Sequence, residues 1–200
     1  MTNTLGCIDS DELGLGDSRP RYDGACIIQS PMRMWLAYAC FSTSAFGLYN
    51  KVLAQSMSEI LLRHEAVMKD RVKSVCGVDI KKTIEIWQSD PNRHMTMRNL
   101  DDTFTHKLFG YESTDDYWTR SSAFYSIEKI RTPTLFLNAK DDPIIGTDTL
   151  EYSVFRKNPY TALATTEHGG HLGYHEGIFA KSKIWIFNPI LGFLQALKES

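Results

Sequence analysis

The chain has 200 residues, of which 42% are hydrophobic and 23% are charged, and its 22 basic and 24 acidic residues give a net charge of −2. This composition is typical of a globular domain with a core of its own and disfavours a disordered chain. Because the charges balance, we expect no nucleic-acid partner and no electrostatic attraction to an anionic membrane surface.

The N-terminal segment 1–23 is rich in Gly, Asp and Ser and is predicted to be a surface loop. It lacks the basic start and apolar core of a signal peptide, and no apolar run approaches the roughly 20 residues that a membrane-spanning helix needs. The cysteines are widely spaced and form no C-x-x-C pair, which favours free thiols in a reducing, cytoplasmic compartment. They are Cys7, Cys26, Cys40 and Cys76.

The first apolar run, Ala25–Ile28, is ended by Ser30 and Pro31, and it predicts a short buried strand. The apolar period then becomes helical. Residues 35–118 are predicted to form a mostly helical insertion between two strands, with its clearest break at 89–92. Within it we predict one long amphipathic helix, because a single face would carry Leu48, Val52, Met57, Ile60, Leu61, His64 and Met68.

The segment Thr132–Tyr174 organises the rest of the chain. Thr134–Leu137 is a short apolar run typical of a buried parallel strand. A helix-length segment, Thr147–Lys157, and a second strand, Tyr160–Thr165, are predicted to follow it. The order strand, helix, strand indicates an α/β fold with a parallel sheet.

An acid and an imidazole follow the ends of these two strands. Asp141 and Asp142 lie just past the end of the strand Thr134–Leu137, and His171 follows the strand Tyr160–Thr165, next to Gly170. Ligands gather outside the carboxyl ends of parallel strands, so these side chains should meet at one edge of the sheet. A carboxylate that accepts from one ring nitrogen holds a histidine in the tautomer of a general base. The pattern therefore predicts two members of a nucleophile–His–acid triad.

The C-terminal segment predicts an amphipathic helix. Asn188 is expected to cap it and Pro189 to be its first residue. Leu191, Leu194 and Leu197 are expected to face the sheet.

Simpler interpretations of these residues remain open. The two aspartates could be only a turn before a helix-starting Pro, and His171 could be an ordinary core or loop histidine. His168 and His175 are expected to be surface groups. The string HGGHLGYH could also place three histidines around a metal ion, although its three glycines disfavour the helix that an H-x3-H pair needs.

Four separated segments resemble the α/β-hydrolase-domain-containing serine hydrolases, in the branch of membrane-anchored phospholipases and acylglycerol lipases. They are LFLNAKDDPI, NPYTALATTEHGGHLGYHEG, FGYESTDDYW and the LYNKVL…LLRH segment. The resemblance runs from about Gly24 to the C-terminus. It implies that Asp142, directly before Pro-Ile, is the triad acid, that His171 is the general base, and that Asp141 caps the turn.

The nucleophile of that family lies on a G-x-S-x-G turn, and no such pattern occurs in these 200 residues. The nearest match, Gly16–Pro20, has Pro in place of its second Gly, and Ser126 with Lys129 fits only the weak pattern S-x-x-K. The resemblance therefore implies a C-terminal portion of an enzyme, with nucleophile, oxyanion hole and any membrane anchor outside the chain. The helical insertion at 35–118 would be a cap; its Met and aromatic content suits a lid over an acyl chain or a self-packed core equally.

Together these features predict an α/β fold, the last three parallel strands of a hydrolase sheet, within a partial domain at 24–200. The implied function is hydrolysis of lipid carboxylic esters by a cytoplasmic or membrane-associated enzyme that needs no metal or organic cofactor. A non-catalytic truncated product or a binding module is the alternative. The strand Ala25–Ile28 would leave an open sheet edge, through which the chain could associate with itself.

Overall fold

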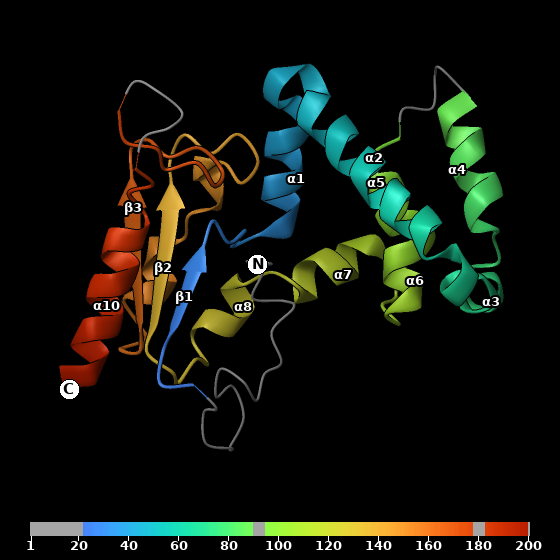
Figure 1. Cartoon of the computed structure of the whole chain (residues 1–200). Coiled ribbons are helices and arrows are strands. Elements are labelled where there is room, and N and C mark those ends of the chain that lie inside the picture. The colour runs from blue at the N-terminus through green and yellow to red at the C-terminus, as the bar shows by residue number, and fades with distance from the viewer. Residues whose placement is uncertain (1–21, 90–94, 178–182, 200) are drawn as a thin grey trace. The chain divides into compact units, whose positions relative to one another are not determined.

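The computed structural model describes residues 22–89, 95–177 and 183–199 (Figure 1). Their internal contacts divide the chain into two compact units. The sheet unit contains the chain up to Cys40 and from Arg120 onward, and the helical unit contains Phe41–Thr119. Nearly all of the loop predicted at 1–23 lies outside the described residues. The predicted division into a hydrolase domain at 24–200 and an insertion at 35–118 stays a prediction.

Three parallel strands form one sheet in the order β1-β2-β3. The strands are β1 (Ala25–Ile28), β2 (Thr134–Ala139) and β3 (Thr161–Thr166). The register pairs Thr134 of β2 with Ala25 on one side and with Thr161 on the other. The α/β class is thus confirmed, and each strand begins within one residue of its predicted start. Because the strands are parallel, their carboxyl ends lie at the same edge of the sheet.

Helices cover both faces of the sheet (Figure 1). Successive side chains of β2 point to opposite faces, so Phe136 and Leu137 belong to different core clusters. The Phe136 cluster is covered by α8 (Phe124–Ile127) and α9 (Tyr152–Phe155). The Leu137 cluster is covered by Tyr174, Trp185 and Ile186 and by α10 (Phe187–Glu199).

The connection between β2 and β3 is less helical than predicted. In place of one helix over Thr147–Lys157, it holds the 3-10 turn η4 (Thr147–Thr149) and the short α9. The reason is local, because Thr147 Oγ1 donates to Lys140 O at 2.7 Å and Thr149 Oγ1 donates to Gly146 O at 2.9 Å. Such side-chain bonds to the backbone compete with helix formation.

The prediction for the face of α10 is wrong for two of its three leucines. Leu191 is 57% exposed and Leu194 is 42% exposed. The helix lies instead with Phe193 and Leu197 over Gly24, where an added Cβ would lie 2.2 Å from Leu197 Cδ1. The helix also begins two residues before Pro189, which its first turn tolerates because the N–H that proline lacks would be unpaired there.

The helical unit consists of short helices around one apolar cluster. Where the sequence predicts one long amphipathic helix, the structure has two, α2 (Leu48–Arg63) and α3 (Glu65–Cys76), with the break at His64. The remaining elements are η2 (Ser44–Gly47), α4 (Ile80–Ser89), α5 (Met97–Leu100), the π-helical turn η3 (Asp101–Thr105), α6 (His106–Leu108) and α7 (Thr114–Arg120). The helix α1 (Met34–Thr43) precedes them in the chain.

The buried face of α2 differs from the predicted one. Its buried residues are Asn50, Ala54 and Ser58, and they are small or polar. The expected core residues that are exposed instead are Leu48, Val52, Met57 and Ile60. The helix packs against α4 and α5, and small side chains on the buried face allow that approach.

Candidate active site

The turn after β2 holds Asp142 in one position. Its side chain is fully buried, and its Oδ1 accepts hydrogen bonds from Ile144 N at 2.7 Å and Ile145 N at 3.0 Å. The Asp142 carbonyl also accepts from Gly146 N at 3.1 Å. With Oδ1 engaged by the turn, the second carboxylate oxygen remains for another partner.

The turn after β3 carries the histidine and depends on its glycines. Tyr174 N donates to Gly169 O at 2.9 Å and closes the turn, while Gly170 has a φ of +59°, which favours glycine. A Cβ at Gly169 would lie 2.7 Å from Tyr174 Cε1 and 2.9 Å from Ala139 Cβ. The turn can therefore approach the end of β2 closely only without a side chain at this position.

The structure brings the two predicted triad residues together. His171 Nδ1 lies 2.9 Å from Asp142 Oδ2, and the His171 side chain is 34% exposed. A carboxylate oxygen can only accept when ionised, so this geometry makes Nδ1 the protonated ring nitrogen. The Nε2 atom is then the nitrogen that can accept a proton from another group. This is the tautomer that a general base needs.

The expectation that Asp141 caps its own turn is wrong, because Asp142 accepts from the amides of that turn. Asp141 reaches across to the histidine turn instead. Its Oδ1 accepts from Gly170 N at 2.8 Å, and its Oδ2 lies 3.3 Å from His168 Nδ1. Both aspartates therefore contact the histidine turn: Asp141 contacts the backbone of Gly170, and Asp142 contacts the imidazole of His171.

Two further side chains in this region escaped the sequence analysis. Gln29 follows β1 and is 2% exposed, and Tyr174 follows the histidine and is 4% exposed. Burial raises the pKa of the Tyr174 phenol, and the carboxylates of Asp142 and Asp141 raise it further. A tyrosine near the histidine could have been suspected from its position in the sequence. No sequence signal distinguishes Gln29 from an ordinary polar residue at a strand end.

The other candidates from the sequence do not join the pair. The side chain of His168 is 90% exposed, His175 is exposed, and the described residues hold no group of three or more metal-ligating side chains. Ser126 lies in α8, next to Ile127. The carbonyl of Ile127 accepts from Asn158 Nδ2, which lies at the amino end of β3. Ser126 is therefore near the amino ends of the strands, whereas His171 is near their carboxyl ends. The match at Gly16–Pro20 lies outside the described residues.

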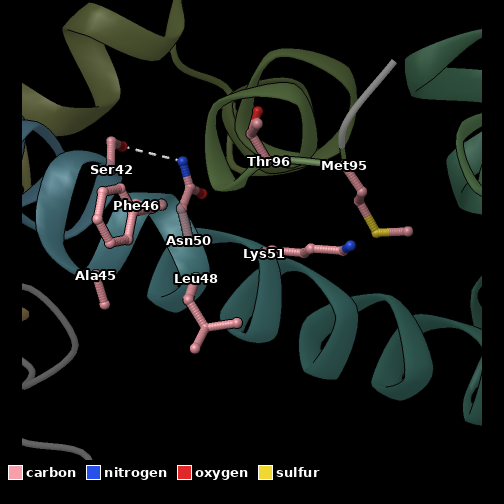
Figure 2. Close-up of a pocket in the computed structure, with 9 residues that line it drawn as sticks. Ser42, Ala45, Phe46, Leu48, Asn50, Lys51, Met95 and Thr96 are labelled. Carbon is pink, nitrogen blue, oxygen red and sulfur yellow. Dashed lines mark hydrogen bonds between the residues drawn. The ribbon is translucent and has the colours of Figure 1, made fainter. Parts of the chain in front are cut away.

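The helical unit has a cavity of its own, of about 550 Å³ (Figure 2). Asn50 is the buried polar residue of its wall, donating to Ser42 Oγ at 3.0 Å and accepting from Met97 N at 2.9 Å. The rest of the lining is mostly apolar, with two hydroxyl residues and one cation: Ala45, Phe46, Gly47, Leu48, Met95, Ser42, Thr96 and Lys51.

Three other properties bear on the function of the chain. Cys26 and Cys76 are free thiols, Cys40 Sγ donates to Pro143 O at 3.5 Å, and Cys7 lies outside the described residues. Burial raises the pKa of the Cys26 thiol, which disfavours a reactive thiolate there. In the part of the chain that the structure describes, no helix is both long and apolar enough to cross a membrane.

No protein-family model matches the chain, but several curated relatives do. A monoacylglycerol lipase of Saccharomyces cerevisiae is 27% identical over 202 residues, which cover 100% of this chain and 42% of the relative. The abhydrolase domain-containing protein 2 of Drosophila melanogaster is 30% identical over 159 residues, or 76% of this chain and 37% of the relative. Phospholipase ABHD3 of Homo sapiens is 33% identical over 104 residues, or 52% and 25%.

The chain therefore spans less than half of the length of each of these relatives. Among solved structures, an esterase from Thermogutta terrifontis matches with a TM-score of 0.38 and 15% identity, over 88% of this chain and 57% of that chain. An epoxide hydrolase of Bacillus megaterium matches with a TM-score of 0.31 and 11% identity, over 86% and 61%.

Proposed function

The chain belongs to the α/β-hydrolase-domain-containing family of serine hydrolases, and from that premise we propose that it is the C-terminal portion of a lipid esterase. In this proposal Asp142 and His171 are the acid and the base of the catalytic triad. The nucleophilic serine lies in a part of the longer protein that precedes these residues. The observation that carries the proposal is the distance of 2.9 Å between His171 Nδ1 and Asp142 Oδ2 at the carboxyl edge of the sheet.

The proposed reaction uses this pair for proton transfer. The serine Oγ attacks the ester carbonyl carbon while His171 Nε2 accepts the hydroxyl proton, and the imidazolium then gives that proton to the leaving alcohol. Water repeats the sequence on the acyl-enzyme and releases the acid. Throughout, Asp142 stabilises the imidazolium and holds the ring, because its other oxygen is fixed by the amides of Ile144 and Ile145.

The relatives and the helical unit support a proposal for the substrate class. The relatives are described as monoacylglycerol lipases and phospholipases, so we propose glycerolipid esters as substrates. The helical unit, Phe41–Thr119, is proposed to be the cap, and its largely apolar cavity of about 550 Å³ has a size suited to part of an acyl chain.

The edge strand β1 is proposed to be the attachment site for the rest of the sheet. In the three-stranded sheet of the described residues, β1 is paired on one side only. Beside it, Leu191 and Leu194 are exposed and border a groove that Tyr22 and Pro133 also line. Such an edge recruits another strand. We therefore expect the isolated chain to associate through β1, which size-exclusion chromatography with light scattering would detect; a sharp monomer peak with a cooperative thermal transition contradicts it.

A second candidate is a non-catalytic product or binding module of the same family. The observation that favours it is that G-x-S-x-G does not occur in the sequence. Under this alternative the Asp142–His171 pair would be retained without a nucleophile to activate.

Labelling with a fluorophosphonate probe distinguishes the two candidates. The probe and a p-nitrophenyl ester are applied to the 200-residue chain alone and to the chain with the N-terminal portion of the yeast relative. The proposal expects neither labelling nor hydrolysis by the chain alone, and both with the added portion, lost again in His171→Ala. If the chain alone hydrolyses the ester and His171→Ala abolishes this, a substitute nucleophile exists. If neither form nor any longer natural product is labelled, the non-catalytic candidate stands.

A further inference from the structure

Gln29 has an unusual backbone conformation for a residue with a long side chain. It directly follows β1, has a φ of +50°, and is only 2% exposed. Non-glycine residues rarely adopt positive φ, and such strain persists where surrounding contacts over-determine it. The backbone N–H of Gln29 donates to Leu137 O at 2.8 Å, which extends the ladder between β1 and β2 by one bond.

The carboxamide of Gln29 joins the two turns that carry the acid and the histidine. Its Oε1 accepts from Ala139 N at 2.9 Å, at the last residue of β2 before the acid turn. Its Nε2 donates to the carbonyl of Gly170, the residue before His171. One buried side chain therefore contacts both segments, although it belongs to a third.

These bonds complement those of the aspartates. Asp141 holds the N–H of Gly170 at 2.8 Å, and Gln29 holds the carbonyl of the same residue. With both polar groups of its backbone engaged, Gly170 has little freedom to rotate about its unusual φ of +59°. His171 is attached directly to this residue, so the direction of its ring depends on the same two bonds.

We infer that Gln29 is a positioning residue for His171, an inference that rests on the proposed function because it specifies how that triad is held. It touches no reacting atom. It acts through Gly170 and the end of β2, and it sets where the imidazole lies relative to Asp142. Small displacements at such a site matter, since a shift of about 1 Å can cost on the order of a hundredfold in rate.

The chemistry of the side chain explains why glutamine suits this position. A carboxamide both donates and accepts, as the N–H of Ala139 and the carbonyl of Gly170 require. Glutamate would still accept from Ala139 N but could not donate while ionised. Methionine has a similar shape and makes neither bond.

Asn158 provides a matched control. It is also a buried carboxamide, 3% exposed, and its Nδ2 donates to Ile127 O and Ile130 O while its Oδ1 accepts from Tyr160 N at 2.9 Å. It lies before β3, at the edge of the sheet opposite His171. Asn158→Leu should therefore weaken the fold without disturbing the imidazole.

The test measures the Nδ1–H proton of His171 by NMR in the full 200-residue chain, assigned by its loss in His171→Gln. A proton shared with Asp142 gives a resonance downfield of the amide region that exchanges slowly with water. Gln29→Glu and Gln29→Met are compared with wild type and with Asn158→Leu, and circular dichroism and thermal melts report whether each variant folds.

We expect both Gln29 variants to raise the exchange rate of this proton by on the order of tenfold or more, as the loss of at least one buried hydrogen bond implies. Asn158→Leu should leave it unchanged. An unchanged resonance in folded Gln29→Glu and Gln29→Met overturns the inference and leaves the proposed function intact. Unfolding of both Gln29 variants while Asn158→Leu folds also overturns it, since Gln29 would then serve the fold as a whole. If wild type lacks the resonance, the pair itself is absent and the proposed function falls with it.

Discussion

The sheet unit and the helical unit use buried polar side chains for different ends. At the carboxyl edge of the sheet, the buried side chains of Asp142 and Gln29 reach across to the histidine turn, where they hold the imidazole of His171 and the backbone of Gly170. In the helical unit, Asn50 and Ser58 are buried on α2, where they bond to neighbouring backbone or side-chain atoms. The first arrangement leaves a titratable nitrogen ready to accept a proton, whereas the second engages its polar atoms in packing. Buried polarity alone therefore does not indicate a site; a partly exposed titratable group held by buried partners does.

The largest expected effect separates the two aspartates of the sheet unit. In a catalytically competent form, Asp142→Asn should keep the fold but lower kcat by on the order of 10⁴, because the imidazole is then held in the wrong tautomer. Asp141→Asn should cost far less, since an amide oxygen can still accept from Gly170 N. Ester hydrolysis by the chain combined with a nucleophile-bearing portion measures both. A larger loss in Asp141→Asn would reassign the acid.

The sequence was sufficient for the strands and for the acid–histidine pair, for a physical reason. Parallel strands bring their carboxyl ends to one edge, so residue order alone places Asp142 near His171. It was not sufficient for Gln29, whose role depends on a side chain bridging segments more than 100 residues apart. Nor could it orient α10, because apolar residues occur on more than one side and the close approach at Gly24 decides which side packs.

The second prediction tests how tightly the histidine turn is packed. Gly169→Ala should lower the free energy of unfolding by about 2–3 kcal/mol, because its Cβ would lie within 2.9 Å of both Tyr174 and Ala139. Gly192→Ala is the control, since it lies within α10 with nothing within 4 Å of the added Cβ. It should gain about 0.5–1 kcal/mol from helix propensity. Urea unfolding measures both, and equal effects would show that the turn yields easily.

The third prediction tests the unexpected face of α2 in the helical unit. Ala54 is fully buried, so Ala54→Leu should overpack the cluster and cost about 1–2 kcal/mol. Val52 is 51% exposed on the same helix, and Val52→Ser should change stability by less than about 0.5 kcal/mol. Chemical denaturation of both variants gives the answer. A costly Val52→Ser with a neutral Ala54→Leu would restore the face that the sequence predicts.

The smallest expected effect concerns Asp101, the buried carboxyl of the helical unit. Burial raises the pKa of Asp101 above its ordinary 3.8, although hydrogen bonds from Thr105 and from Trp118, whose Nε1 lies 2.8 Å from Oδ2, oppose this. A raised pKa in the folded state means that the unfolded chain loses this proton first as the pH rises. The contribution of Asp101 to stability is therefore greatest at pH values below its ordinary pKa, and it declines as the pH rises through the pKa of the folded state.

Asp101→Asn removes this titration and keeps an oxygen that can accept from Trp118. We expect the variant to be more stable than wild type at pH 7 by about 1 kcal/mol or less. Its free energy of unfolding should also lack the part of the pH dependence in the acid range that Asp101 contributes. Urea unfolding at several pH values, followed by tryptophan fluorescence, measures the difference. If the variant is less stable at pH 7, the ionised carboxylate is stabilised by Arg98, the nearby cation, by more than burial costs it. The helical unit would then hold a buried charge that serves its fold, and the contrast with the sheet unit would rest on the partly exposed imidazole of His171 alone.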